Sequence, residues 1–170
     1  MRRFNKRFLY QFLALLVPFL TFCSPSWLSL VGIGPGWAEL WLLPWALVEG
    51  PVAGAFSGLL LGLLLDSINL GAPTNIPALI ILGYLWGRLG REDKFEEKFF
   101  SLGFLSWLGS FTSGLSIWAQ EIFFAKGSYM PFFNIWAFQT VLAGSIITGL
   151  ISPILCSYII TFLLKRKSLS

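Results

Sequence analysis

The chain has 170 residues, of which 56% are hydrophobic and only 12% are charged. Soluble domains carry about 25% charged residues, so this composition excludes an ordinary globular domain and indicates a membrane protein. The net charge of +4 could suggest a nucleic-acid partner. We expect none, because the basic residues flank hydrophobic segments and are better explained as determinants of membrane topology.

Hydrophobic segments recur along the chain and predict six membrane helices. They lie at residues 8–23, 37–48, 50–70, 75–89, 98–121 and 135–164. Only helices and closed barrels satisfy every backbone polar group in lipid, and the short alternating segments of a barrel are missing here. The predicted fold class is therefore an all-α, polytopic integral membrane helix bundle that forms a single domain over residues 1–170.

The first two segments need separate comment. The segment at 8–23 follows MRRFNKR but no small-residue cleavage motif follows it, so we expect a retained helix and not a signal peptide. The segment at 37–48 is short against the roughly 20 residues that a span requires. It is expected to be kinked at Pro44, tilted, or joined to a partly buried lead-in that ends at Gly34-Pro35-Gly36.

The basic residues form three clusters, with Lys126 alone outside them. The clusters are Arg2, Arg3, Lys6 and Arg7 before the first segment; Arg88, Arg91, Lys94 and Lys98 around the loop between the fourth and fifth; and Lys165, Arg166 and Lys167 after the sixth. With six spans, all three lie on one side of the membrane. The positive-inside rule then predicts that both termini are cytoplasmic.

Glycine recurs at every fourth position of EGPVAGAFSGLLLGLLLDSINLG, which runs from residue 49 to residue 71. The members of this glycine ladder are Gly50, Gly54, Gly58 and Gly62, and the next step of four reaches Asp66. Four residues exceed one helical turn by about 40°, so neighbouring glycines share a face. Such a groove lets another helix approach closely. The ladder predicts a central helix whose glycines pack within the chain or against a partner.

Asp66 has two interpretations. It could end its helix and accept hydrogen bonds from GAPTNIP, where Thr74 or Asn75 could begin the next helix. Alternatively it could face a cavity or a partner, because an aspartate at a helix C-terminus opposes the macrodipole. Three further acids, Glu39, Glu49 and Glu121, lie near segment ends and are expected at solvated or headgroup level.

Trp37, Trp41 and Trp45 also repeat at steps of four, along the second segment. Tryptophan is enriched at membrane interfaces, so belt and packing roles are one interpretation. The other is an aromatic surface for a partner helix or an apolar ligand.

Several kinds of chemistry find no support. The chain has no histidine, the usual general base and a common metal ligand. It has no nucleophile elbow, Walker loop or cysteine cluster, and Cys23 and Cys156 are expected to be packing residues. We therefore expect no catalytic residue, no metal, no cofactor and no enzymatic activity.

Three stretches between residues 35 and 91 resemble the MreD family, membrane subunits of the bacterial rod-shape system, and in particular its cyanobacterial branch. They are GPGWAELWLLPWAL, GAFSGLLLGLLLDSINLGAP and LIILGYLWGRLGR. Residues of the family's third-helix run are matched by Gly58, Gly62, Asp66, Leu70 and Gly71. Pro35 matches the proline that opens the second helix, but Gly36 stands where Asp or Asn is common.

The resemblance implies a non-enzymatic component of the elongation machinery in the bacterial cytoplasmic membrane. It would bind MreC and help couple MreB filaments to peptidoglycan synthesis by RodA and its transpeptidase partner, and so regulate cell shape. The family is similar in fold to the substrate-binding subunits of energy-coupling-factor vitamin transporters.

Such a transporter subunit is the alternative function. It would capture a vitamin and dock on an ATPase module through small residues of the first helix. Here the first segment offers only Ala14 for that purpose, and the outer loops hold few polar groups that could recognise a hydrophilic vitamin. The sequence therefore favours the rod-shape interpretation.

Overall fold

The computed structural model describes residues 16–22, 29, 32–68, 73–90, 99–124 and 135–168. Its helices are α2 (Leu16–Phe22), α3 (Trp37–Glu49), α4 (Pro51–Ile68), α5 (Ile76–Gly90), α6 (Phe99–Phe124) and α7 (Ile135–Ser168). No strand occurs in these ranges. The predicted all-helical class is confirmed.

The helix bounds follow the hydrophobic segments closely. Helices α3 to α7 begin and end within a few residues of the segments predicted at 37–48, 50–70, 75–89, 98–121 and 135–164. Most of the first segment, 8–23, lies outside the described residues, and α2 covers its second half. Segment ends were predictable because a change from apolar to polar or glycine-rich sequence stops a helix.

Two of the described helices are long and apolar enough to cross a membrane, within Pro51–Ile68 and Trp136–Leu163. Their outward faces carry large apolar side chains. Exposed examples are Val52, Phe56 and Leu63 on α4, and Ile146, Leu150, Ile154 and Tyr158 on α7. Soluble monomers rarely expose such continuous apolar surface, whereas lipid solvates it. Composition and surface therefore agree on a membrane environment for these two helices.

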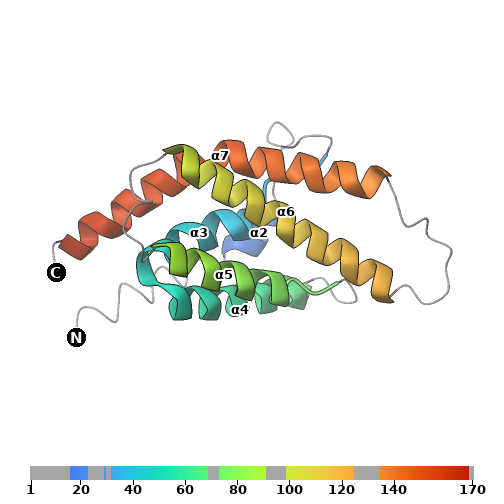
Figure 1. Ribbon diagram of the computed structural model, residues 1–170, viewed down its shortest axis with the longest axis horizontal. Coiled ribbons are helices and arrows are strands. Elements are labelled where there is room, and N and C mark those ends of the chain that lie inside the picture. Colours follow the sequence, from blue (N-terminus) through green and yellow to red (C-terminus); the bar gives the residue numbers. More distant parts are fainter. Residues whose placement is uncertain are drawn as a thin grey trace.

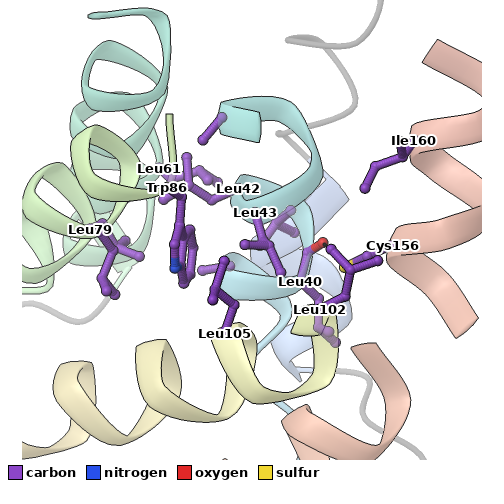
Figure 2. Packing of buried hydrophobic residues seen from close by; sticks show 14 residues of the cluster. Leu40, Leu42, Leu43, Leu61, Leu79, Trp86, Leu102, Leu105, Cys156 and Ile160 are labelled. Atoms are coloured by element: carbon purple, nitrogen blue, oxygen red, sulfur yellow. Dashed lines mark hydrogen bonds between the residues drawn. The ribbon is translucent and has the colours of Figure 1, made fainter. Parts of the chain in front are cut away.

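Helix α3 lies between two helix pairs (Figure 1). One pair is formed by α4 and α5, the other by α6 and α7, and α3 contacts all four helices and α2. Figure 2 shows the result: Leu40, Leu42 and Leu43 of α3 meet side chains from both pairs, such as Trp86 of α5 and Leu102 of α6. Eight of the 13 residues of α3 are buried. The central helix is therefore α3, and the expectation that the glycine-rich segment holds this place is wrong.

Helix α3 has 13 residues, about 20 Å at 1.5 Å per residue, and it begins beside the middle of α6 and α7. The backbone N–H of Gly36 donates to Thr148 Oγ1 of α7 over 2.9 Å. Residues 32–36 before the helix are not helical, and Pro35 among them is buried. Of the three predicted explanations for the short segment, a partly buried lead-in fits this geometry, and the helix continues through Pro44.

Candidate functional site

The glycine ladder of α4 packs against α5. A Cβ atom added to Gly54 would overlap the carbonyl oxygen of Gly83, and one added to Gly83 would overlap that of Gly54. Further along, Gly58 lies against the backbone of Leu79, and a Cβ on Gly62 would come within 2.7 Å of the Ile76 Cα. The two backbones therefore approach each other along the ladder, as close packing in lipid requires.

The first member of the ladder, Gly50, forms the turn between α3 and α4. Its φ of 98° lies in a region that glycine adopts without steric cost, and its N–H donates to the Ala46 carbonyl over 2.9 Å. Gly87 of α5 lies directly against Gly50. Sequence reasoning missed this second half of the interface, although Gly83 and Gly87 also repeat at a step of four.

Asp66 holds the start of α5. Its Oδ1 accepts hydrogen bonds from the backbone N–H of Asn75 over 2.9 Å and from Asn75 Nδ2 over 3.0 Å. The Asn75 carbonyl in turn accepts the N–H of Leu79, the first backbone bond of the helix. Of the two predicted interpretations, the hydrogen-bonding role toward the next helix is the one that this geometry matches. Asp66 Oδ2 is buried and has no hydrogen-bond partner among the described residues.

Gln120 of α6 bonds the segment that precedes α5. Its Oε1 accepts the N–H of Thr74 over 2.8 Å, and its Nε2 donates to the Thr74 carbonyl over 2.9 Å. One side-chain amide thus satisfies both backbone groups of a residue outside any helix. No sequence pattern singles out Gln120, because its partner is the backbone of Thr74, a residue distant in the chain.

We expect Asp66→Ala to destabilise the chain by about 1–2 kcal/mol, the usual loss when the side chain that caps a helix start is removed. Hydrogen exchange of the amides at the start of α5 would accelerate. Ser67→Ala is the matched control, because the exposed Ser67 hydroxyl bonds, among the described residues, the Leu64 carbonyl of its own helix. Equal exchange rates at the start of α5 in the two variants would contradict the role of Asp66.

The tryptophan repeat points into the molecule. Trp45 is 3% exposed, and its ring stacks on that of Trp41 with centroids 6.2 Å apart. Trp37 and Trp41 are half-buried and pack against the core. Trp45 cannot form part of a partner face without unpacking α3, so the predicted aromatic partner surface is wrong at this position. The packing interpretation fits all three residues.

Glu39 lies inside the molecule. It is 8% exposed, and its Oε1 lies 2.5 Å from the hydroxyl oxygen of Ser113, near the middle of α6. A Cβ atom on Gly36 would collide with the Glu39 carboxyl group, so glycine leaves the room that this group occupies. The expectation of a solvated Glu39 is wrong, because α3 begins beside the middle of α6 and α7 and the acid is buried there.

Burying this acid is costly. Taking an ionised group out of water into a protein interior costs several kcal/mol. The macrodipole favours a negative charge in the first turn of α3 by typically about 0.3–1 kcal/mol, which is too little to compensate. No basic side chain among the described residues forms an ion pair with Glu39. The carboxyl group therefore depends on its hydroxyl partner.

Buried hydroxyl groups also join α6 to α7. Ser106 donates to the Thr148 carbonyl over 3.3 Å, and Ser152 donates to the Leu102 carbonyl over 3.2 Å. The Cys156 Sγ lies 3.3 Å from the Ser152 Oγ and 3.7 Å from the Leu40 carbonyl oxygen of α3. Small polar residues act in this way between membrane helices, where they permit close approach and bond across the interface. Cys156 is a packing residue, as predicted, and Cys23 lies outside the described residues.

The basic clusters are only partly visible. Arg88 is exposed in the last turn of α5, and the backbone of Lys165, Arg166 and Lys167 belongs to the end of α7. Arg2, Arg3, Lys6, Arg7, Arg91, Lys94 and Lys98 lie outside the residues whose side chains are described. The end of α5, the start of α6 and the end of α7 lie toward the same end of the molecule (Figure 1).

No protein-family model matches the chain, and no curated protein or solved structure matches it either. Among the described residues, no group of three or more His, Cys, Asp and Glu side chains could hold a metal ion.

Proposed function

We propose that this chain is a non-enzymatic membrane component of a bacterial rod-shape complex, with the role of an MreD subunit. In this role it binds MreC in the cytoplasmic membrane and helps couple MreB filaments to peptidoglycan synthesis by RodA and its transpeptidase partner. The proposal combines the resemblance of residues 35–91 with the packing of α4 against α5.

One observation carries the proposal. Three residues of the resembling third-helix run, Gly58, Gly62 and Asp66, belong to a single structural unit: the glycines contact the backbone of α5, and the aspartate bonds the residue that begins it. The other two, Leu70 and Gly71, lie outside the described residues.

The helix arrangement also supports a six-span topology with cytoplasmic termini. Successive helices from α3 to α7 alternate in direction (Figure 1). This places the described ends of α5 and α7, which carry Arg88 and the segment 165–167, toward one end of the molecule. One basic end is what the positive-inside rule requires of a multi-pass protein.

The packing restricts where MreC can bind. Since α5 covers the glycine ladder and α3 is enclosed, a partner helix contacts an outward face. The exposed stripe of α7 extends over several turns, and Leu150 and Tyr158 within it are 70% and 77% exposed. Lipid or a partner helix can occupy such a face without any change in the core.

Co-purification tests the proposal. We expect the chain, solubilised in mild detergent, to retain MreC encoded by the same genome, and a polytopic membrane protein of unrelated function to retain none. Native mass spectrometry of the same preparation separates the alternative. A tightly bound vitamin together with no retained MreC would replace the rod-shape proposal by a transporter subunit.

A further inference from the structure

Two contacts of different kinds join α6 to α5 and to the segment before it. In the first, the Trp86 ring of α5 lies against Gly109 of α6, where an added Cβ atom would collide with the ring. In the second, the side-chain amide of Gln120 bonds both backbone groups of Thr74. Gly109 and Gln120 are about three turns apart along α6, so the two contacts are well separated.

The contact at Trp86 is the firmer of the two. The side chain is 3% exposed and belongs to the hydrophobic core. A buried ring is held by many dispersion contacts at once, and the missing side chain of Gly109 makes the room that the ring occupies. We therefore expect this contact to persist when other parts of the α5–α6 interface move.

The contact at Gln120 is the easier to break. Both of its hydrogen bonds are exposed, so water can replace either partner at little net cost. Thr74 itself is exposed, and so are the three residues that follow Gln120 in α6. Exposed hydrogen bonds and few buried contacts are typical of segments that open locally in a folded protein.

Few other contacts hold the two helix pairs together at this end. Among the described residues, α4 makes no extended contact with α6 or α7, and α5 makes none with α7. Helix α6 begins beside α7 and ends near the start of α5 (Figure 1). The bonds from Gln120 to Thr74 therefore lie where the end of α6 reaches the other pair.

A polar stretch of α6 lies between the two contacts. Ser113 and Ser116 share a face with Gly109 and Gln120, because steps of three and four residues bring side chains to one side of a helix. Ser116 Oγ accepts a hydrogen bond from Gln120 Nε2 over 3.3 Å, and Ser113 Oγ bonds the buried Glu39. Separation of the helices at Gln120 would uncover this stretch in the direction of Glu39.

We propose that Gln120 is a latch: its amide holds α6 closed on the residue before α5, and its release lets the two helices separate at this end. The Trp86 ring stays against Gly109 and acts as the pivot of the movement. The inference uses the contacts between α5 and α6 and is independent of the proposed partner complex.

Distances between spin labels, measured by electron paramagnetic resonance, test the latch in the full chain in detergent with both native cysteines replaced by alanine. One label pair, Ser67→Cys and Phe123→Cys, uses exposed positions near the ends of α4 and α6. The other, Leu85→Cys and Leu108→Cys, uses exposed positions beside the pivot. We expect Gln120→Ala to add a longer distance to the first pair and to leave the second pair unchanged.

Gln139→Ala is the matched control, because it makes the same change at an exposed glutamine of α7. It should leave both distance distributions as they are in the chain with Gln120. A first pair that Gln120→Ala does not alter would overturn the proposal. Equal lengthening of both pairs would also overturn it, because this result indicates general loosening of the bundle and not movement about a pivot.

Hydrogen exchange of the wild-type chain keeps the proposal falsifiable if Gln120→Ala does not fold. The Thr74 N–H donates across the latch to Gln120, whereas the next N–H along the chain, that of Asn75, donates to Asp66 of α4. Opening of the latch exposes the first amide alone, so we expect Thr74 to exchange faster than Asn75. Equal exchange rates would contradict the latch. Neither experiment involves MreC, so failure here leaves the proposed function intact.

Discussion

Replacing Gly54 or Gly83 by alanine is expected to destabilise the folded chain by about 3 kcal/mol, near the upper end of the usual cost of overpacking. Each added Cβ would overlap a backbone carbonyl oxygen of the facing glycine. A backbone cannot rotate away as a side chain can, so α4 and α5 must separate. This cost exceeds the roughly 1 kcal/mol that alanine gains over glycine in helix propensity. Denaturant unfolding of the purified protein in detergent micelles measures the difference.

Gly144→Ala is the matched control for this prediction. Among the described residues, a Cβ at Gly144 of α7 would meet the Ile33 Cγ2 alone, at 3.4 Å, so the same change should be neutral or slightly stabilising. The double variant of Gly54 and Gly83 should lose less than the sum of the two single losses, because both changes disrupt one contact. Losses no larger than that of Gly144→Ala would show that the two helices do not approach as closely as described.

The same packing bears on whether the glycine ladder can contact MreC directly. Replacement of Gly58 and Gly62 by leucine would block MreC binding without a change in fold if these glycines faced a partner. Because both lie on the backbone of α5, the expected first effect is loss of the α4–α5 pair itself. A binding defect in that variant therefore has to be compared with its stability before it is assigned to an interface.

The helices could be predicted from the sequence, but their neighbours could not. Hydropathy marks where each segment begins and ends because the cost of an unsatisfied backbone in lipid is high. The ladder indicated a close contact for α4, but the step of four between Gly83 and Gly87 of α5, which would indicate another, was missed. Neither pattern indicates that the glycines of α4 and those of α5 contact each other, since spacing along a helix does not identify the helix that faces it.

Whether a given side chain is buried was harder to predict from the sequence. Glu39 lies near the start of a hydrophobic segment, and such acids commonly lie at the membrane surface. Its burial follows from the position of the short α3 beside the middle of α6 and α7, and tertiary packing sets this position. The tryptophan repeat has the same ambiguity: a step of four defines a face, but burial of Trp45 decides that the face is internal.

Loss of the hydroxyl beside Glu39 should have the other large effect. Ser113→Ala leaves a buried carboxyl group with no hydrogen-bond partner among the described residues, and an unsatisfied buried polar group costs about 1–3 kcal/mol. We expect a loss near 3 kcal/mol. Thr112→Ala on the neighbouring position is the control, because its exposed hydroxyl bonds the Leu108 carbonyl of its own helix; surface changes of this kind remain within about 0.5 kcal/mol.

The double variant Glu39→Leu with Ser113→Ala distinguishes an unpaired acid from a simple cavity. Replacing both polar partners by apolar groups is often nearly neutral, so the double variant should recover most of the stability that Ser113→Ala loses. Glu39→Leu alone should cost little, because the remaining Ser113 hydroxyl can donate to the Ser110 carbonyl. Denaturant unfolding in micelles measures the stability of the wild-type chain, of each single variant and of the double variant. A double variant as unstable as Ser113→Ala would assign the loss to the missing atoms of the serine, and the carboxyl group of Glu39 would then have no part in joining α3 to α6.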